Sequence, residues 1–199
     1  MKTLTTLIFA FVLILVAQPV DAAGCKYSKD KVDPFTKVHT RVTKWKQLTS
    51  SWMAEQREID GWVAANSIDD KYRLWIKLDY TTRTKTDPSE YEFEDAIVIL
   101  EGAPLYVLMA DESVVKLLAE KEVRKNSYDI APNEQQFETS EYRVRAVATI
   151  HYVLDAAAME ALSNQSATNL RITADDRNFD IEFNKKSVDN IKDTILCIQ

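Results

Sequence analysis

Alternation of apolar and polar side chains from Tyr72 to Tyr80 is the feature that most restricts how this chain folds. One face of the run carries Tyr72, Leu74, Ile76, Leu78 and Tyr80, and the other carries Arg73, Trp75, Lys77 and Asp79. Successive side chains of a β-strand point to opposite faces, so a period of two predicts a strand with one buried face. Residues 59–65 form a preceding strand, and the turn-forming residues 66–70 join the two as a predicted hairpin.

Further strands are predicted on the same grounds. Residues 142–154 alternate but carry apolar groups on both faces, which indicates a central strand. Residues 96–100 and 105–109, joined by Glu101-Gly102-Ala103-Pro104, predict a second hairpin. Residues 111–123 fit either a helix capped by Asp111 or a strand from Val114 to Val123, and the β-branched residues favour the strand.

The last part of the chain adds two helices. Asp155 is the expected cap of a short helix near 156–162, and two short strands, 170–173 and 179–183, follow. A C-terminal helix near 188–198, with Ser187 as N-cap, carries an apolar stripe of Val188, Ile191, Ile195 and Ile198. The expected fold is therefore α+β, a single domain built on an antiparallel β-sheet of about six to nine strands.

The first residues have the pattern of an export signal. Lys2 is followed by an apolar run from Leu4 to Val16, and Val20 and Ala22 suit the −3 and −1 positions of a cleavage site. We expect residues 1–22 to be a cleaved signal peptide and 23–199 to be one exported domain, periplasmic or secreted, without a membrane span. The alternative is a lipoprotein anchored through Cys25.

The two cysteines, Cys25 and Cys197, lie near opposite ends of the exported part. At about 100° per residue, Cys197 falls opposite the apolar stripe of its helix, where an N-terminal segment can reach it. Export favours persistent disulfides, so the sequence predicts a bridge between these residues. The alternative is two independent thiols.

Composition excludes several functions. Three glycines in 199 residues leave no phosphate-cradling loop, and two histidines and two cysteines form no recognisable zinc motif. A net charge of −6 does not suit binding to nucleic acid. We therefore predict no cofactor, no metal and no nucleic-acid partner.

The candidate ligand-binding residues are two tryptophans and the basic residues near them in the sequence: Arg41, Trp45, Arg73, Trp75 and Lys77. Trp75 is expected on the polar face of its strand beside Arg73 and Lys77, and Trp45 on one face of an earlier strand with Arg41. Such tryptophans stack on a sugar ring or join a protein interface. The alternative is that another layer covers this face and both indoles belong to the core.

No catalytic motif is recognisable, which favours a non-enzymatic binding or protein-interaction domain whose partner is a cell-envelope component or another protein. One alternative is a hydrolase acting on cell-envelope material with His151 as general base. Another is a structural or assembly subunit that self-associates through strand edges. The ligand and the oligomeric state stay open at this point.

Overall fold

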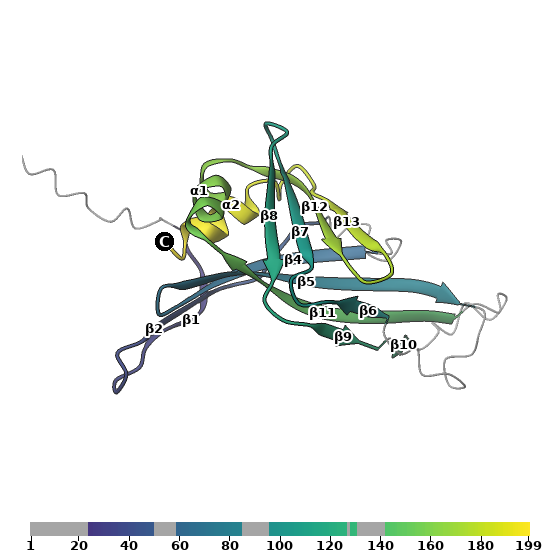
Figure 1. The fold of residues 1–199 in the computed structure, drawn as a ribbon, viewed down its shortest axis with the longest axis horizontal. Helices are drawn as coiled ribbons and strands as arrows, with labels where there is room; N and C mark the ends of the chain where they lie inside the picture. The colour runs from purple at the N-terminus through teal and green to yellow at the C-terminus, as the bar shows by residue number, and fades with distance from the viewer. Residues whose placement is uncertain (1–23, 50–58, 85–95, 127, 131–141) are drawn as a thin grey trace, which may run out of the picture.

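A computed structural model describes residues 24–49, 59–84, 96–126, 128–130 and 142–199 of the chain (Figure 1). The expected signal peptide, residues 1–22, lies outside the described residues. The strands are β1 (Tyr27–Val32), β2 (His39–Thr43), β3 (Lys46–Gln47), β4 (Ile59–Ile68), β5 (Lys71–Thr84), β6 (Ile97–Ile99), β7 (Pro104–Met109), β8 (Val114–Ala119), β9 (Val123–Lys125), β10 (Tyr128–Ile130), β11 (Tyr142–Leu154), β12 (Ala167–Thr173) and β13 (Asn178–Glu182). The helices are α1 (Ala156–Asn164) and α2 (Asn190–Leu196).

The strands form one large antiparallel sheet in the order β1-β2-β4-β5-β11-β8-β7-β12-β13. β3 adds to β4 and β10 to β11, while β6 and β9 pair with each other in a small separate sheet. The prediction of an α+β fold on an antiparallel sheet is confirmed. β11 pairs with β5, β8 and β10, so the prediction that residues 142–154 form a central strand is also confirmed.

The predicted hairpin is present as β4 and β5, with a tighter turn than expected. β4 continues through Asn66 to Ile68, and only Asp69 and Asp70 form the turn, with φ of 50° and 57°. Two successive left-handed residues match the twist of the flanking strands. Aspartate tolerates this conformation better than most residues other than glycine.

The predicted hairpin of residues 96–109 is wrong. β6 pairs with β9, and β7 lies between β8 and β12. Each segment is a strand, but its backbone groups bond to partners elsewhere in the chain, which a local pattern cannot show. Residues 114–119 form strand β8 after a turn in which Glu112 has a φ of 69°, so the strand interpretation is confirmed for this part. The strand ends at Ala119 and not at Val123, which begins β9.

Both predicted helices are present, and one of the two predicted caps is wrong. Asp155 caps α1 by accepting a hydrogen bond of 2.7 Å from the Ala158 backbone N–H. α2 begins two residues later than expected, and Ser187 does not cap it. The Ser187 hydroxyl is instead buried and bonds to the carbonyls of Asn184 and Leu48, because this segment is a turn that anchors the helix to the chain after β3.

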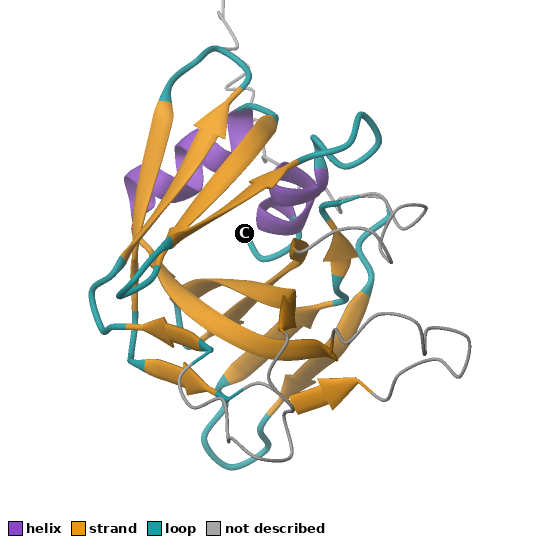
Figure 2. Cartoon of the chain, turned by 90° about the vertical axis from the view of Figure 1, so that its right-hand side faces the viewer, coloured by secondary structure: helices purple, strands orange, loops and turns teal. Residues whose placement is uncertain are grey.

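The sheet bends so that its last strands, β12 and β13, lie over β4 (Figure 1 and Figure 2). β13 packs against β4, with Ile181 lying directly on Gly61. α1 packs on α2 and β8, and α2 packs on β4, so the helices bridge the two parts of the sheet at one end of the molecule. The core lies between these layers, and its largest fully buried side chains include Leu74, Ile76, Leu78, Ile150, Tyr152 and Phe179.

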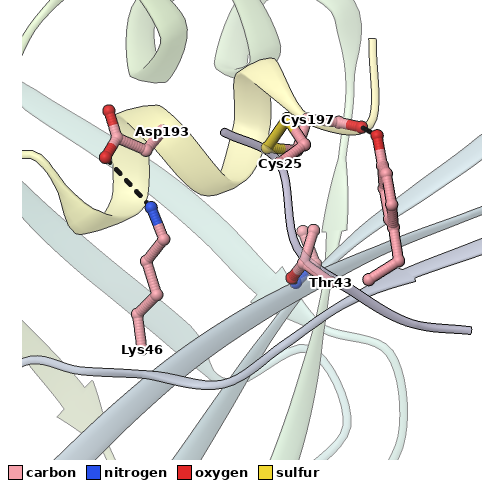
Figure 3. The surroundings of a disulfide bond; sticks show 7 residues. Cys25, Thr43, Lys46, Asp193 and Cys197 are labelled. Atoms are coloured by element: carbon pink, nitrogen blue, oxygen red, sulfur yellow. Dashed lines mark hydrogen bonds and ion pairs between the residues drawn. A yellow bond between two sulfur atoms is a disulfide. The ribbon is translucent and has the colours of Figure 1, made fainter. Parts of the chain in front are cut away.

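The predicted disulfide joins Cys25 to Cys197, whose Cα atoms are 5.6 Å apart (Figure 3). The Tyr27 hydroxyl donates a 2.7 Å hydrogen bond to the Cys197 carbonyl, and Lys46 forms a 3.0 Å ion pair with Asp193 of α2. Ile191, Ile195 and Ile198 of the predicted stripe are buried. The bridge thus ties the first strand to the last helix, as an oxidising compartment permits. Among the described residues no helix has the length and apolar character of a bilayer span.

Candidate functional site

A β-bulge between β2 and β3 decides where Trp45 lies. Val42 pairs with Asn66 and Lys46 pairs with Val63, so three residues on one side oppose two on the other. An extra residue reverses the faces to which the following side chains point. Trp45 therefore lies on the outer face of the sheet and not with Arg41, so the prediction that these two share a face is wrong.

The bulge is held by a side chain of its own. The buried Thr43 hydroxyl accepts a hydrogen bond of 2.9 Å from the Ala65 backbone N–H, which lies between the segments of β4 that pair with β2 and with β3. A buried backbone N–H without an acceptor destabilises a fold, so the hydrogen bond to this hydroxyl stabilises the bulge. Thr43 thereby positions the tryptophan two residues later.

Three aromatic rings lie in a row across the outer face. The centroids of the Trp45 and Trp75 rings are 6.3 Å apart with 38° between their planes. The centroids of the Trp75 and His151 rings are 4.7 Å apart with 14° between their planes. Trp45 is 41 % exposed, whereas Trp75 is half-buried between its two neighbours. The row holds the Trp75 ring in one orientation and leaves Trp45 open to contact.

An arginine–glutamate pair flanks the row. Nε and Nη2 of Arg73 donate to the two carboxylate oxygens of Glu120 at 2.6 to 2.8 Å. Glu120 follows β8, and its backbone N–H bonds to the His151 carbonyl at 2.8 Å, which fixes it next to β11. Hydrogen bonding to Arg73 holds the pKa of Glu120 below its ordinary value, and the same bonds raise the pKa of Arg73.

Trp75, His151, Arg73 and Glu120 line an open groove of about 520 Å³, within the size range of small-ligand sites. The groove is lined by Val38, Asn66, Ile68, Asp69, Lys71, Arg73, Trp75, Glu120 and His151. Asn66 is only 3 % exposed, and among the described residues its side-chain oxygen has no hydrogen-bond partner. The indole N–H of Trp75 is also buried, and nothing in the described part of the chain pairs it. Two residues of the groove lining therefore carry one unused acceptor and one unused donor.

His151 is held neutral by its surroundings. Burial is the main cause that lowers its pKa, and the charges of Lys121 and Arg73 act in the same direction, whereas Glu120 opposes them. Its ring is stacked on Trp75, and the nearby carboxylate of Glu120 is bonded to Arg73. Within the described residues no carboxylate or hydroxyl is hydrogen-bonded to the imidazole, and the Glu120 carboxylate is bonded to Arg73 instead. The general base of a hydrolase needs such partners.

The five predicted ligand-binding residues do not all come together. Arg73, Trp75 and Trp45 do, and Lys77 lies farther along the same face, with its ammonium nitrogen 4.6 Å from the Trp62 ring centroid. Arg41 lies on the opposite face, where it lines a smaller hollow with His39 and Tyr72.

Six of the nine groove residues were not among the residues singled out from the sequence: Val38, Asn66, Ile68, Asp69, Lys71 and Glu120. Asn66 was assigned to a turn, and Glu120 directly follows a strand that pairs with β11, a partner far away in sequence. The alternation of Val114, Lys116, Leu118 and Glu120 is the signal that places Glu120 on the outer face.

No group of three or more His, Cys, Asp and Glu side chains in the described part of the chain has the arrangement of a metal site. No family model, no curated protein and no solved structure matches this chain.

Proposed function

We propose that this chain is an exported, non-enzymatic binding domain that binds its partner on the outer face of β4, β5 and β11. The partner is a component of the cell envelope or another protein. The observation that carries the proposal is the row Trp45–Trp75–His151 at the edge of a groove. Rigid, partly exposed aromatic side chains next to an arginine are typical of binding sites.

Two features support binding over hydrolysis. The His151 ring is engaged in a stack with Trp75, and Glu120 is engaged by Arg73. A hydrolase would instead orient the imidazole through a carboxylate and place a hydroxyl or water against it. The bridge between Cys25 and Cys197 supports export, because such bonds persist in oxidising compartments.

A thermal-shift screen against envelope sugars, envelope lipids and small metabolites tests the proposal. A ligand at 100 times its Kd adds about 2.7 kcal/mol of apparent stability, which raises the Tm measurably. Trp45→Ala should abolish the shift, because Trp45 is the exposed end of the ring row. Phe35→Ala is the matched control, because Phe35 is 91 % exposed in the turn between β1 and β2. A screen without any shift, or a shift that W45A and wild type share, would contradict the proposal.

A further inference from the structure

The fixed charges of the groove sum to zero. Lys71 and Arg73 are balanced by Asp69 and Glu120, and His151 is held neutral. Arg73 and Glu120 are moreover joined by paired hydrogen bonds, so neither presents a free charge. With equal numbers of positive and negative side chains in its lining, the groove itself offers no excess charge to a phosphate, a polyanion or a cation. Its chemistry suits a ligand without net charge.

The polar groups are instead arranged to serve hydroxyls. Among the described residues, the buried Asn66 side-chain oxygen is an acceptor without a partner, and the buried Trp75 indole N–H is a donor without one. The outer edges of Arg73 and Glu120 add a further donor and a further acceptor beside them. A hydroxyl group both donates and accepts, so one class of ligand satisfies this mixture. A buried polar group without a partner costs free energy in the free protein, so a ligand that supplies the missing hydrogen bond gains binding free energy.

The tryptophan row supplies the apolar complement. Trp75 is held between Trp45 and His151, so the exposed Trp45 ring is presented in a defined orientation. A pyranose ring has an apolar C–H face that packs on an indole while its hydroxyls point sideways. In a chain of such sugar rings, one unit can contact Trp45 while another unit lies in the groove.

We propose that the groove and the Trp45 ring together bind a neutral saccharide chain, a glycan of hexose or N-acetylhexosamine units without charged groups. This inference rests on the proposed binding function of the same face. A protein partner fits the geometry less well, because a specific protein interface covers about 800 Å² on each partner, and its core is mostly paired apolar surface. The groove is lined by nine residues, fewer than the about 20 to 30 that such an interface takes from each partner, and it has polar groups left to pair.

The test uses calorimetric titration of the full exported chain with cellohexaose, maltohexaose and chitohexaose as neutral probes and hexagalacturonate as the anionic one. At least one neutral probe should bind and quench tryptophan fluorescence. Its Kd should stay constant between about 50 mM and about 500 mM NaCl, because screening does not affect an uncharged ligand. Trp45→Ala should weaken binding about tenfold, and Phe35→Ala should leave it unchanged.

Glu120→Gln separates neutral from anionic ligands. It removes one negative charge from the groove and keeps the side-chain shape, so an anion should bind more tightly, whereas a neutral glycan should bind no more tightly and lose at most the hydrogen bond to the replaced carboxylate oxygen. Each variant is checked for an unchanged circular dichroism spectrum before titration.

Three results overturn the inference. Binding of hexagalacturonate alone, strengthened by E120Q and weakened by salt, keeps the binding function but excludes the neutral glycan. A thermal shift with an envelope lipid or a protein partner, but with no glycan, also keeps the binding function and excludes the neutral glycan. If no probe of any class binds, the proposed function fails together with the inference.

Discussion

Trp75 and His151 are directly opposed on strands β5 and β11, and their rings lie nearly parallel with centroids 4.7 Å apart. The imidazole is half-buried in this stack, and burial disfavours its charged form. This contact therefore couples the outer face of the sheet to pH.

We expect the stability of the protein to fall as the pH drops below about 6.5. Burial, aided by Lys121 and Arg73, lowers the folded-state pKa of His151 from its ordinary value of 6.5. Below pH 6.5, His151 is protonated in the unfolded chain but still neutral in the folded chain. The free energy of unfolding therefore decreases until the pH passes the folded-state pKa. Lowered carboxylate pKa values such as that of Glu120 act only below about 4.5, in a separate window.

His151→Phe isolates this effect, because phenylalanine preserves a stacked ring and cannot titrate. The unfolding free energies of both proteins are measured with urea between pH 7.5 and 5. As the pH falls, the unfolding free energy of the wild type should decrease relative to that of H151F. His39 is present in both proteins and so cancels in the difference. Parallel curves, or a wild type that gains stability in acid relative to the variant, would show that His151 is not the responsible group.

Removal of the disulfide should lower the unfolding free energy by about 2 to 5 kcal/mol. The bridge closes a loop between residues 172 positions apart, so it restricts the unfolded chain strongly. Urea unfolding of a Cys25→Ser/Cys197→Ser double variant measures the loss. Dithiothreitol should destabilise the wild type by a similar amount and leave the double variant unaffected. Two alkylatable thiols in the non-reduced protein would disprove the bridge.

Gly61→Ala should destabilise the fold by about 1 to 3 kcal/mol. A Cβ at this position would lie 2.6 Å from Cδ1 of Ile181 on the facing strand β13. Ile181→Val removes that methyl group at a cost of about 0.5 to 1.5 kcal/mol of its own. The double variant should lose less stability than the sum of the single variants in chemical unfolding. Strict additivity would mean that β4 and β13 are not in contact there.

Thr43→Val should cost about 1 to 3 kcal/mol, because the Ala65 N–H loses its acceptor while the shape is kept. Thr43→Ser retains the hydroxyl and should stay close to wild type. Near-ultraviolet circular dichroism reports the Trp45–Trp75 pair, and T43V should weaken that signal if the bulge loosens. Equal stability of T43V and T43S would show that the hydroxyl does not hold the bulge.

Local patterns predicted the parts of the fold whose partners are also local. The hairpin of β4 and β5 and the cap at Asp155 follow from alternation and from turn and cap chemistry within a few residues. Strands were correctly expected at residues 96–100 and 105–109, where β6 and β7 lie, but the predicted pairing was wrong, because β7 pairs with β8 and β12 and β6 pairs with β9.

The candidate site was predictable only in part for the same reason. Alternation placed Arg73, Trp75 and Lys77 on one face. The position of Trp45 depends on a bulge that a threonine hydroxyl holds, and no period reports such an irregularity. Glu120 reaches Arg73 because β8 is paired with β11 and β11 with β5, two long-range pairings in succession.

The bond between Cys25 and Cys197 makes the stretch from one to the other a covalent ring. A tension applied through the chain on either side of this ring passes across the two sulfur atoms and never reaches the sheet. A single backbone cut by a protease in any loop likewise leaves both pieces attached to each other. The domain thus resists pulling and nicking through one bond that lies outside its hydrophobic core.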